Sequence, residues 1–289
     1  LFFIEYLYIS ITFKRVNNNF LDMLKDDMDT IKKSTNMFIF ADKTRNIYET
    51  TKETYHKLLC ENITRTYKKT DNNKLKSVNL EAKQVANKLG IADRVNCIAE
   101  KPAFITLKDH KENFENAPKC RLINPSKSEL GKVSKRITER LINSIKENKL
   151  LNQWNNSNAV IEWFSNIKDK QTHIFVQFDI VDFYPSISHD LFLQAINFAK
   201  QYADIKPDEL NILLHCKKAL LFNNESTWIK KDALQDFDVT MGSFDGAETC
   251  ELVCLFILNQ LTDTFNQGQV GLYRDDGLAV VKYTNGHHA

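Results

Sequence analysis

Apolar residues recur along this chain with two different periods, so the sequence predicts both helices and strands. Phe20, Leu24, Met28 and Ile31 follow helical spacing and share one face of a first helix. The same pattern and its flanking residues predict helices at 51–69, 77–90, 127–149, 156–168, 189–202, 208–222 and 246–265. Short runs rich in β-branched and aromatic residues predict strands at 37–41, 103–107, 120–124, 173–179 and around 228.

Near the end of the chain, two apolar stretches flank the run Tyr273-Arg274-Asp275-Asp276-Gly277, which predicts a hairpin. Asp-Gly between β-formers is a strong turn signal, because such turns need residues that tolerate a positive φ. The order of elements predicts an α+β fold in which helices cover one face of an antiparallel sheet. With 289 residues, 43% of them hydrophobic, the chain can bury a sizeable core and form two subdomains.

Charge is concentrated in one part of the chain. The net charge of +2 excludes a protein that binds nucleic acid by charge alone, but it leaves room for a local basic patch. Residues 101–140 supply one, with ten Lys or Arg against five Asp or Glu. Such a segment can follow a phosphate backbone, with an affinity that falls as salt rises, although a solvated helix face explains part of it.

The six cysteines contain no Cys-x-x-Cys pair. Cys250 and Cys254 are interpreted as small core residues of one helix rather than as metal ligands. A reduced intracellular compartment, cytoplasm or nucleus, is therefore expected. The apolar run at 1–13 is too short to span a bilayer, so no membrane partner is expected.

Asp275 and Asp276 become candidates for catalysis only together with a second acidic segment, because another Asp pair stands at Asp26-Asp27. Asp179 ends the strand predicted at 173–179, where its side chain can face an open cleft. If the two strands are neighbours, the carboxylates converge, and at ~4 Å they repel by about 4 kcal/mol at an effective dielectric constant near 20. Such a cluster needs protons or a cation, and oxygen ligands favour Mg²⁺. Two such ions stabilise both reacting oxygens of a phosphoryl transfer, which indicates nucleotidyl transfer.

Three segments, in this order along the chain, resemble motifs A, B and C of reverse transcriptases. They are Phe178-Asp179-Ile180 with Phe183-Tyr184-Pro185-Ser186-Ile187, then Thr240-Met241-Gly242-Ser243-Phe244, then Tyr273-Arg274-Asp275-Asp276. Segments 104–111 and 119–124 are similar to the fingers of that family. Phe40-Ala41-Asp42-Lys43 is most like a box of Penelope-like retroelement enzymes, so the resemblance is to these or to other non-LTR elements. Order and spacing together are more specific than any single motif.

The resemblance implies a role for each matching residue. Asp179, Asp275 and Asp276 would be catalytic and, with the backbone carbonyl of Ile180, would hold two Mg²⁺ ions, for which Mn²⁺ can substitute. The residues implied to bind the incoming nucleotide are Tyr184, Gly242, Lys43, Lys108, Lys111 and Arg121. Those implied to contact primer or template are Tyr273, Arg274 and Ser243. The implied partners are an RNA template, a DNA or RNA primer and deoxynucleoside triphosphates.

Simpler interpretations stand beside these roles. In the family an aromatic at the place of Tyr184 lies under the sugar and excludes a 2′-hydroxyl, but a core aromatic would look the same in sequence. Gly242 would let the backbone approach the nascent base pair, or it would cap the helix that starts near Gly246. Lysines on loops are usually just solvated. Asp245 adds a negative charge near the expected template and departs from the family pattern.

The resemblance also implies a right-hand polymerase arrangement, with a helical extension at 1–35, fingers at 36–168 and a palm at 169–289. The thumb and later palm motifs are not in this sequence, so a fragment is expected. The expected function is RNA-directed DNA synthesis by a retroelement enzyme, which adds a deoxynucleotide to a primer 3′-hydroxyl. One alternative is an RNA-templated RNA polymerase, which generally has Asp where Tyr184 stands. The other is a degenerate nucleic-acid-binding remnant without catalysis.

Overall fold

The computed structural model describes residues 18–95, 100–125, 127–266 and 268–283, and the apolar run at 1–13 lies outside them. Its longer helices are α2 (Asn18–Lys33), α3 (Lys52–Thr66), α4 (Asn72–Lys88), α5 (Glu129–Asn148), α6 (Ser157–Asn166), α7 (Phe183–Ser186), α8 (His189–Ala199), α9 (Pro207–His215) and α10 (Gly246–Thr264). Within the described ranges, no helix is both long enough and apolar enough to cross a membrane.

The strands form four small sheets. They are β1 (Met37–Phe40), β2 (Ile47–Thr50), β3 (Tyr67–Thr70), β4 (Phe104–Leu107), β5 (Cys120–Ile123), β6 (Asn152–Gln153), β7 (His173–Asp179), β8 (Leu221–Asn223), β9 (Ser226–Lys230), β10 (Val270–Tyr273) and β11 (Asp276–Lys282). Two of the sheets are the hairpins β1–β2 and β4–β5, and a third has the order β3-β9-β8.

The four-stranded sheet has the order β6-β10-β11-β7. Strands β10, β11 and β7 are antiparallel, as the sequence predicts, whereas the short β6 joins β10 in parallel. β11 pairs with β7 along its whole length, from Asp276 opposite Asp179 to Lys282 opposite His173. Because successive side chains point to opposite faces, this register decides which residues share a face.

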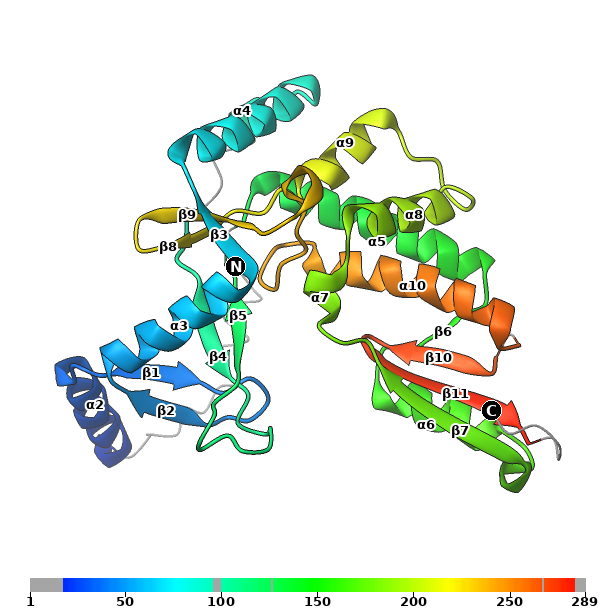
Figure 1. Cartoon of the computed structure of the whole chain (residues 1–289), viewed down its shortest axis with the longest axis horizontal. Helices are drawn as coiled ribbons and strands as arrows, with labels where there is room; N and C mark the ends of the chain where they lie inside the picture. Colours follow the sequence, from blue (N-terminus) through cyan, green and yellow to red (C-terminus); the bar gives the residue numbers. More distant parts are fainter. Residues whose placement is uncertain (1–17, 96–99, 126, 267, 284–289) are drawn as a thin grey trace, which may run out of the picture.

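Helices α5, α8 and α10 pack on one face of this sheet and form the main hydrophobic core with it (Figure 1). Val270, Leu272 and Ala279 supply the strand side of that core and are at most 1% exposed. Each fully buried aliphatic side chain stabilises the fold by about 1.5–3 kcal/mol. On the opposite face, Phe164 of α6 contacts Phe175 of β7, with ring centroids 5.1 Å apart. The sheet that carries the acidic residues is therefore packed on both faces.

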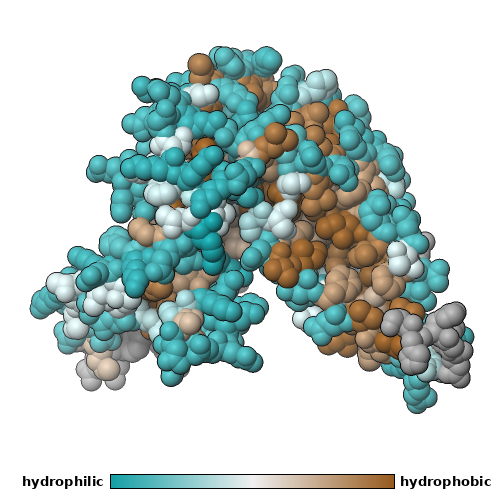
Figure 2. Space-filling model, viewed as in Figure 1, coloured by the Kyte–Doolittle hydropathy of each residue, from teal (hydrophilic) through white to brown (hydrophobic). Residues whose placement is uncertain are grey.

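The hairpins β1–β2 and β4–β5, with α2 and α3, form a second arm of the molecule (Figure 1). Ile39, Ile63, Ile105 and Leu107 centre its smaller core. The β3-β9-β8 sheet joins strands from distant parts of the chain, since β3 pairs with β9. In space-filling view the surface is hollowed between the two arms, and apolar side chains gather on the arm that holds the four-stranded sheet (Figure 2). The domain limits at 35 and 168 stay predictions.

Most predicted helices and strands are present, and two errors come from strands that pair over long distances. The helix predicted at 51–69 ends at Thr66, because the next four residues form β3 against β9. The helix predicted to reach 222 ends at His215, and the apolar run that follows becomes the buried strand β8. A short apolar run does not distinguish a buried strand from a buried helix by its period.

A third error concerns a helix start. The helix expected to begin at Ser77 begins at Asn72, because the Asp71 carboxylate accepts the Lys74 N–H at 3.1 Å. Asp is a good N-cap residue, and this cap satisfies a donor that has no partner inside the helix. Gly90 follows the end of this helix with a φ of 66°, which agrees with the predicted stop.

The hairpin is present, but its turn is not the predicted Asp-Gly. Tyr273 and Asp276 close the hairpin as a pair, so Arg274 and Asp275 form the turn, and Arg274 takes the positive φ of 58°. Gly277 lies inside β11 opposite Phe178. A Cβ at Gly277 would lie 2.1 Å from Phe178 Cε2. The glycine is required by an aromatic ring lying across the strand, not by the turn.

Gly277→Ala should therefore destabilise the protein by about 1–3 kcal/mol, because the added methyl group forces the Phe178 ring out of its packed position. Urea unfolding gives the measurement, and Phe178→Leu in the same chain should recover part of the loss. Gly90→Ala is the control, because an added Cβ there has no atom within 4 Å, although Gly90, unlike Gly277, has a positive φ. It should cost about 1 kcal/mol from the backbone alone. A wild-type midpoint for Gly277→Ala would contradict the packing argument.

Candidate functional site

Asp179, Asp275 and Asp276 come together where β7 meets the β10–β11 hairpin. Asp276, the first residue of β11, lies directly opposite Asp179, the last residue of β7. The backbone N–H of Ile180 donates to the Asp275 carbonyl at 2.8 Å and holds the turn against the end of β7. Opposite residues of an antiparallel pair have Cβ atoms about 4.5–5.5 Å apart. The strand register thus produces the convergence that the sequence predicts.

The electrostatics of this cluster are unfavourable without a positive partner. Burial and the charges of Asp275 and Asp179 raise the pKa of Asp276, while the charge of Lys43 lowers it. Within the described ranges, no three or more His, Cys, Asp or Glu side chains are grouped so that they could hold a metal ion. Mg²⁺ is usually bound by one or two carboxylates together with substrate phosphates, so a magnesium site at these carboxylates stays a prediction.

Tyr184 lies close to the acidic cluster, on the short helix α7. The ring is partly buried at the margin of the main core, and burial is the chief reason that its pKa is raised to about 12. An added Cβ on Gly246 would lie 3.5 Å from Tyr184 Cε1, so the ring rests against the start of α10. Lys230 Nζ donates to the Pro185 carbonyl at 2.6 Å and fixes the turn that carries the ring. Phe183, the residue before Tyr184, is 5% exposed and is the aromatic that packs fully into the core.

Gly242 brings two backbone segments into close contact. Its φ is 114°, and an added Cβ would lie 2.3 Å from the Asn124 carbonyl oxygen. The Asn124 N–H donates to the Met241 carbonyl at 2.9 Å. Gly242 is not the cap of α10, because Asp245 occupies that position. The close contact with Asn124 is therefore enough to explain a glycine at position 242. Contact between Gly242 and a base pair stays a prediction.

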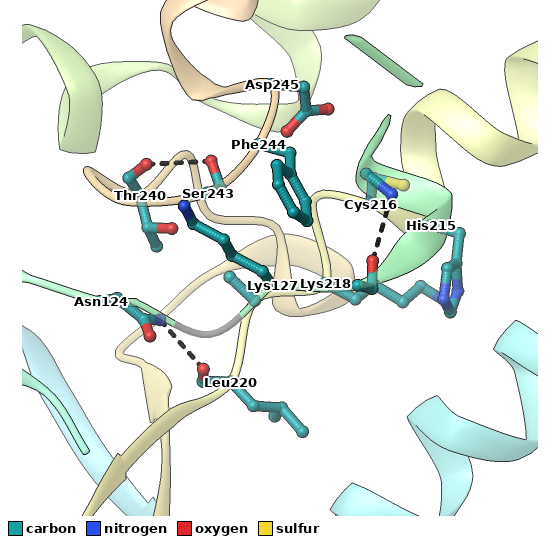
Figure 3. Close-up of a pocket in the computed structure, with 13 residues that line it drawn as sticks. Asn124, Lys127, His215, Cys216, Lys218, Leu220, Thr240, Ser243, Phe244 and Asp245 are labelled. Atoms are coloured by element: carbon teal, nitrogen blue, oxygen red, sulfur yellow. Dashed lines mark hydrogen bonds between the residues drawn. The ribbon is translucent and has the colours of Figure 1, made fainter. Parts of the chain in front are cut away.

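The loop at 240–246 lies over a cavity of about 40 Å³, beside the start of α5 and the segment 215–220 (Figure 3). Within the loop, the Ser243 hydroxyl donates to the Thr240 carbonyl at 3.1 Å. Lys127 Nζ lies 4.9 Å from the centroid of the Phe244 ring. The cavity has room for a water molecule but not for a nucleotide. This cavity is therefore too small to be a substrate site.

The expectation that Asp245 places a negative charge near the template is wrong. Asp245 is 1% exposed and forms an ion pair with Lys217, which is equally buried. Its carboxylate also accepts a hydrogen bond from the Ser134 hydroxyl. The charge is compensated inside the protein, because a carboxylate so deeply buried needs a partner.

The candidate cations all lie on the opposite arm. Arg121 of β5 forms an ion pair with Asp42 at 2.7 Å. Lys108 follows β4, and burial together with the charge of Arg121 lowers its pKa. Lys111 is exposed and adds to the positive charge around Lys108. Lys43 is the cation that acts on the acidic cluster, through Asp276.

Asp109 fixes the loops that carry these lysines. Thr44 Oγ1, Asn46 Nδ2 and the Tyr48 hydroxyl donate to the same oxygen of Asp109 at 2.5, 2.9 and 3.0 Å. These bonds tie the loop after β1 to the loop after β4. Hydrogen bonds to a charged acceptor are stronger than those between neutral groups. The two loops are therefore held in fixed relative positions.

Tyr273 and Arg274, the candidate primer contacts, lie at the tip of the β10–β11 hairpin. Arg274 is exposed and forms no ion pair with a described acidic residue; its Cζ lies 6.0 Å from the Tyr273 ring centroid. The Cys254 thiol donates to the Arg274 carbonyl at 3.1 Å, which anchors the turn on α10. Cys250 and Cys254 are buried in the core, as predicted.

The residues that hold these candidates in place were not predicted from the sequence. Asp42, Asp109 and Lys230 each bond to a residue far along the chain, and Asp42 and Arg121 are 79 positions apart. No local pattern reports such a pair. The available signals were the position of Asp42 within the box that resembles the retroelement enzymes and that of Asp109 within the segment 104–111.

Comparison with known proteins gives a likeness of fold. No protein-family model matches the chain, and no curated protein is significantly similar to it. Among solved structures, apo telomerase from Candida tropicalis, truncated from its C-terminal domain, matches with a TM-score of 0.56 and 11% identity over 86% of this chain and 52% of that one. Telomerase from the same organism, in complex with the TWJ fragment of telomeric RNA, matches with a TM-score of 0.56 and 11% identity over 89% and 44%.

Telomerase from Candida albicans, in complex with the same kind of RNA fragment, has a TM-score of 0.56 and 10% identity over 90% of this chain and 47% of that one. The chain thus spans about half the length of these structures. At such low identity the similarity concerns the fold alone, which is reverse-transcriptase-like.

The raised pKa of Asp276 predicts that Asp276→Asn stabilises the protein at neutral pH. The folded state holds the Asp276 proton more tightly than the unfolded state, so the ionised carboxylate opposes folding above that pKa, and Asn removes this cost. Urea unfolding should show a small gain at pH 7 that disappears as the pH falls below the raised pKa. Asp232→Asn, at an exposed position outside the cluster, is the control and should change little. A loss of stability in Asp276→Asn at pH 7 would contradict the repulsion argument.

Proposed function

We propose that this chain is the fingers and palm of an RNA-directed DNA polymerase that adds deoxynucleotides to a primer 3′-hydroxyl. The observation that carries the proposal is the register that sets Asp276 opposite Asp179, with Asp275 held in the adjoining turn. The charge of Lys43, which belongs to the other arm, lowers the pKa of Asp276, and the chain has a reverse-transcriptase-like fold.

In the proposed reaction the primer hydroxyl attacks the α-phosphate of a deoxynucleoside triphosphate, and pyrophosphate leaves. Lys43, Lys108 and Lys111 would balance the charge of the triphosphate from the opposite arm, since phosphoryl transfer depends on positioning and charge neutralisation. Arg121 would act less directly, because Asp42 already pairs with it. Tyr184 would limit the space under the sugar.

Asp179, Asp275 and Asp276, with the Ile180 carbonyl, would hold Mg²⁺ ions, or Mn²⁺ in their place. When bound, such ions stabilise the attacking and leaving oxygens of an in-line displacement. The raised pKa of Asp276 beside Asp275 and Asp179 supports this role, because a bound cation would offset the repulsion between the carboxylates. The retroelement origin rests on the motif resemblance alone, above all on the box at 40–43.

Primer extension on an RNA template with Mg²⁺ tests the proposal, with wild type beside Asp179→Asn and Asp275→Asn. Wild type should incorporate deoxynucleotides, and each variant should lose at least about 10²–10³-fold in rate, because it removes charge stabilisation at the reacting centre. Circular dichroism should show that both variants fold. Either variant extending at the wild-type rate would refute the site assignment.

The same assay separates the alternatives. Preference for ribonucleotides would move the assignment to an RNA-templated RNA polymerase. Template binding without extension by any form would identify a nucleic-acid-binding remnant. Asp232→Asn serves as the control variant and should extend at the wild-type rate, because that carboxylate is exposed and lies outside the acidic cluster.

Tyr184→Ala should admit ribonucleotides and lower the preference for deoxynucleotides by about tenfold or more, because a pocket that excludes a hydroxyl by contact loses that contact. Tyr184→Phe is the matched control, since it keeps the ring and removes only the phenolic hydroxyl, and its preference should stay at the wild-type value. The measurement is kcat/KM for paired nucleotides that differ only at the 2′ position. An unchanged preference in Tyr184→Ala would make Tyr184 a core aromatic.

A further inference from the structure

Two of the most deeply buried charged residues in the described structure pair with each other at the end of the loop at 240–246. Lys217 and Asp245 are each 1% exposed, and their side chains form an ion pair. Ser134, fully buried in α5, donates its hydroxyl to the same carboxylate oxygen that contacts Lys217. Lysine and aspartate are almost never so buried unless paired. The burial of this pair therefore serves a structural or functional role that the exposed ion pairs do not have.

Asp245 occupies the N-cap position of α10, but its carboxylate does not cap the helix. An Asp in that position ordinarily accepts a backbone N–H from the first turn. Here only its backbone carbonyl does so, from the N–H of Thr249 at 2.9 Å and the Thr249 hydroxyl at 2.7 Å. The side chain turns inward to Lys217 instead. Helix α10 therefore lacks a side-chain cap, and the loop before it is anchored to Lys217 instead.

Lys217 is itself held in place by α8, by the end of α9 and by the backbone of Asp238. Its N–H donates to the Leu214 carbonyl at 3.1 Å, at the end of α9, and its carbonyl accepts the Asp238 N–H at 2.8 Å. The ammonium group also lies 5.7 Å from the centroid of the Phe192 ring of α8. The ion pair therefore links α5, α8 and α9 to the N-cap residue of α10.

The segment that this anchor holds is the loop at 240–246, which includes Gly242 and Ser243. At the end of the loop, Gly246 packs close to the Tyr184 ring. An added Cβ on Gly246 would lie 3.5 Å from Tyr184 Cε1, which is van der Waals contact. A shift of the loop would therefore move the surface on which Tyr184 rests. A buried ion pair resists such a shift, because separating the partners leaves a charge without compensation in a region of low dielectric constant.

We propose that Lys217 and Asp245 are positioning residues, which hold the loop at 240–246 against Tyr184 and so set how strictly the site selects the sugar of the incoming nucleotide. This inference rests on the proposed function for its substrate, but its structural part stands alone. The loop would stay folded without the pair and would lose its fixed distance from Tyr184.

The test replaces both charges at once, as Lys217→Met with Asp245→Leu. Replacing a whole buried ion pair by apolar residues of similar size often preserves stability, whereas removing one partner does not. Ser134 can turn its hydroxyl to the carbonyl four residues earlier in α5. The matched control is Lys146→Met with Glu251→Leu, which makes the same change in an ion pair that also joins α5 to α10 but is 32% and 35% exposed.

Hydrogen exchange at 240–249 and steady-state kinetics give the two readouts. The buried double variant should exchange faster in this segment but not in β7 and β11. Its KM for deoxynucleotides should rise about tenfold, since small displacements near reacting groups are costly, and its preference over ribonucleotides should fall. The surface double variant should match wild type in both respects.

A folded buried double variant with wild-type exchange, KM and sugar preference would overturn the proposal. If it fails to fold, Ser134→Ala replaces it, and a smaller change in the same direction supports the proposal while wild-type values overturn it. If wild type itself incorporates no nucleotide, the proposed function fails, and exchange at 240–249 decides alone whether the pair holds the loop. If the buried double variant has a lower melting temperature but the wild-type sugar preference, the pair has a purely structural role, and the proposal is overturned.

Discussion

Strand β11 pairs with β7 along its whole length, and the candidate site exists only in this register. The pairing sets Asp276 opposite Asp179, and it also places Gly277 beneath the Phe178 ring and Ala279 in the main core. A slip of one residue would turn the apolar side chains of β11 away from α8 and α10. The hydrophobic core therefore stabilises an arrangement in which like charges are adjacent, and the raised pKa of Asp276 reports the cost. Such a cost is expected where a cation or a substrate is to be bound.

Buried polar interactions in this molecule occur where loops near the site must be held in place. Asp109 accepts three hydrogen bonds and joins two loops of the second arm. The pair formed by Lys217 and Asp245 fixes the entrance of α10, and Lys230 holds the turn that carries Tyr184. Hydrophobic contacts are not directional, so they fix such loops less tightly than paired charges and hydrogen bonds. The loops that carry these residues are thus held with little freedom to move.

Prediction of the fold succeeded where the signal was local. The helices α5 and α8 have clear 3.6-residue periods, α10 is a long and mostly apolar segment, and the strands β4, β5 and β7 are short runs of β-formers with turn residues beside them. β3 and β8 were mistaken for ends of helices, because only their partner strand β9, distant from β3 in the sequence, decides their conformation. The same holds for the candidate site, where features with a local signal were predicted and long-range pairs were not. The order of its motifs indicated that Asp179 and Asp275 converge, but nothing local indicated that Asp245 would be buried with Lys217 or that Asp42 would engage Arg121.

The sequence by itself determined the chemical inventory and most of the local structure: two acidic strand ends, an aromatic residue after the first, a glycine-containing loop and a basic segment before them. These features depend on neighbouring residues, whose propensities and spacing act over a few positions. The tertiary structure decided which charges are exposed to solvent and which are neutralised inside the protein. That choice depends on burial and on partners 28 to 111 positions away, as for Asp245 with Lys217 and Ser134. The free energy of a charge is set by what surrounds it in space, and the order of residues along the chain does not contain that information locally.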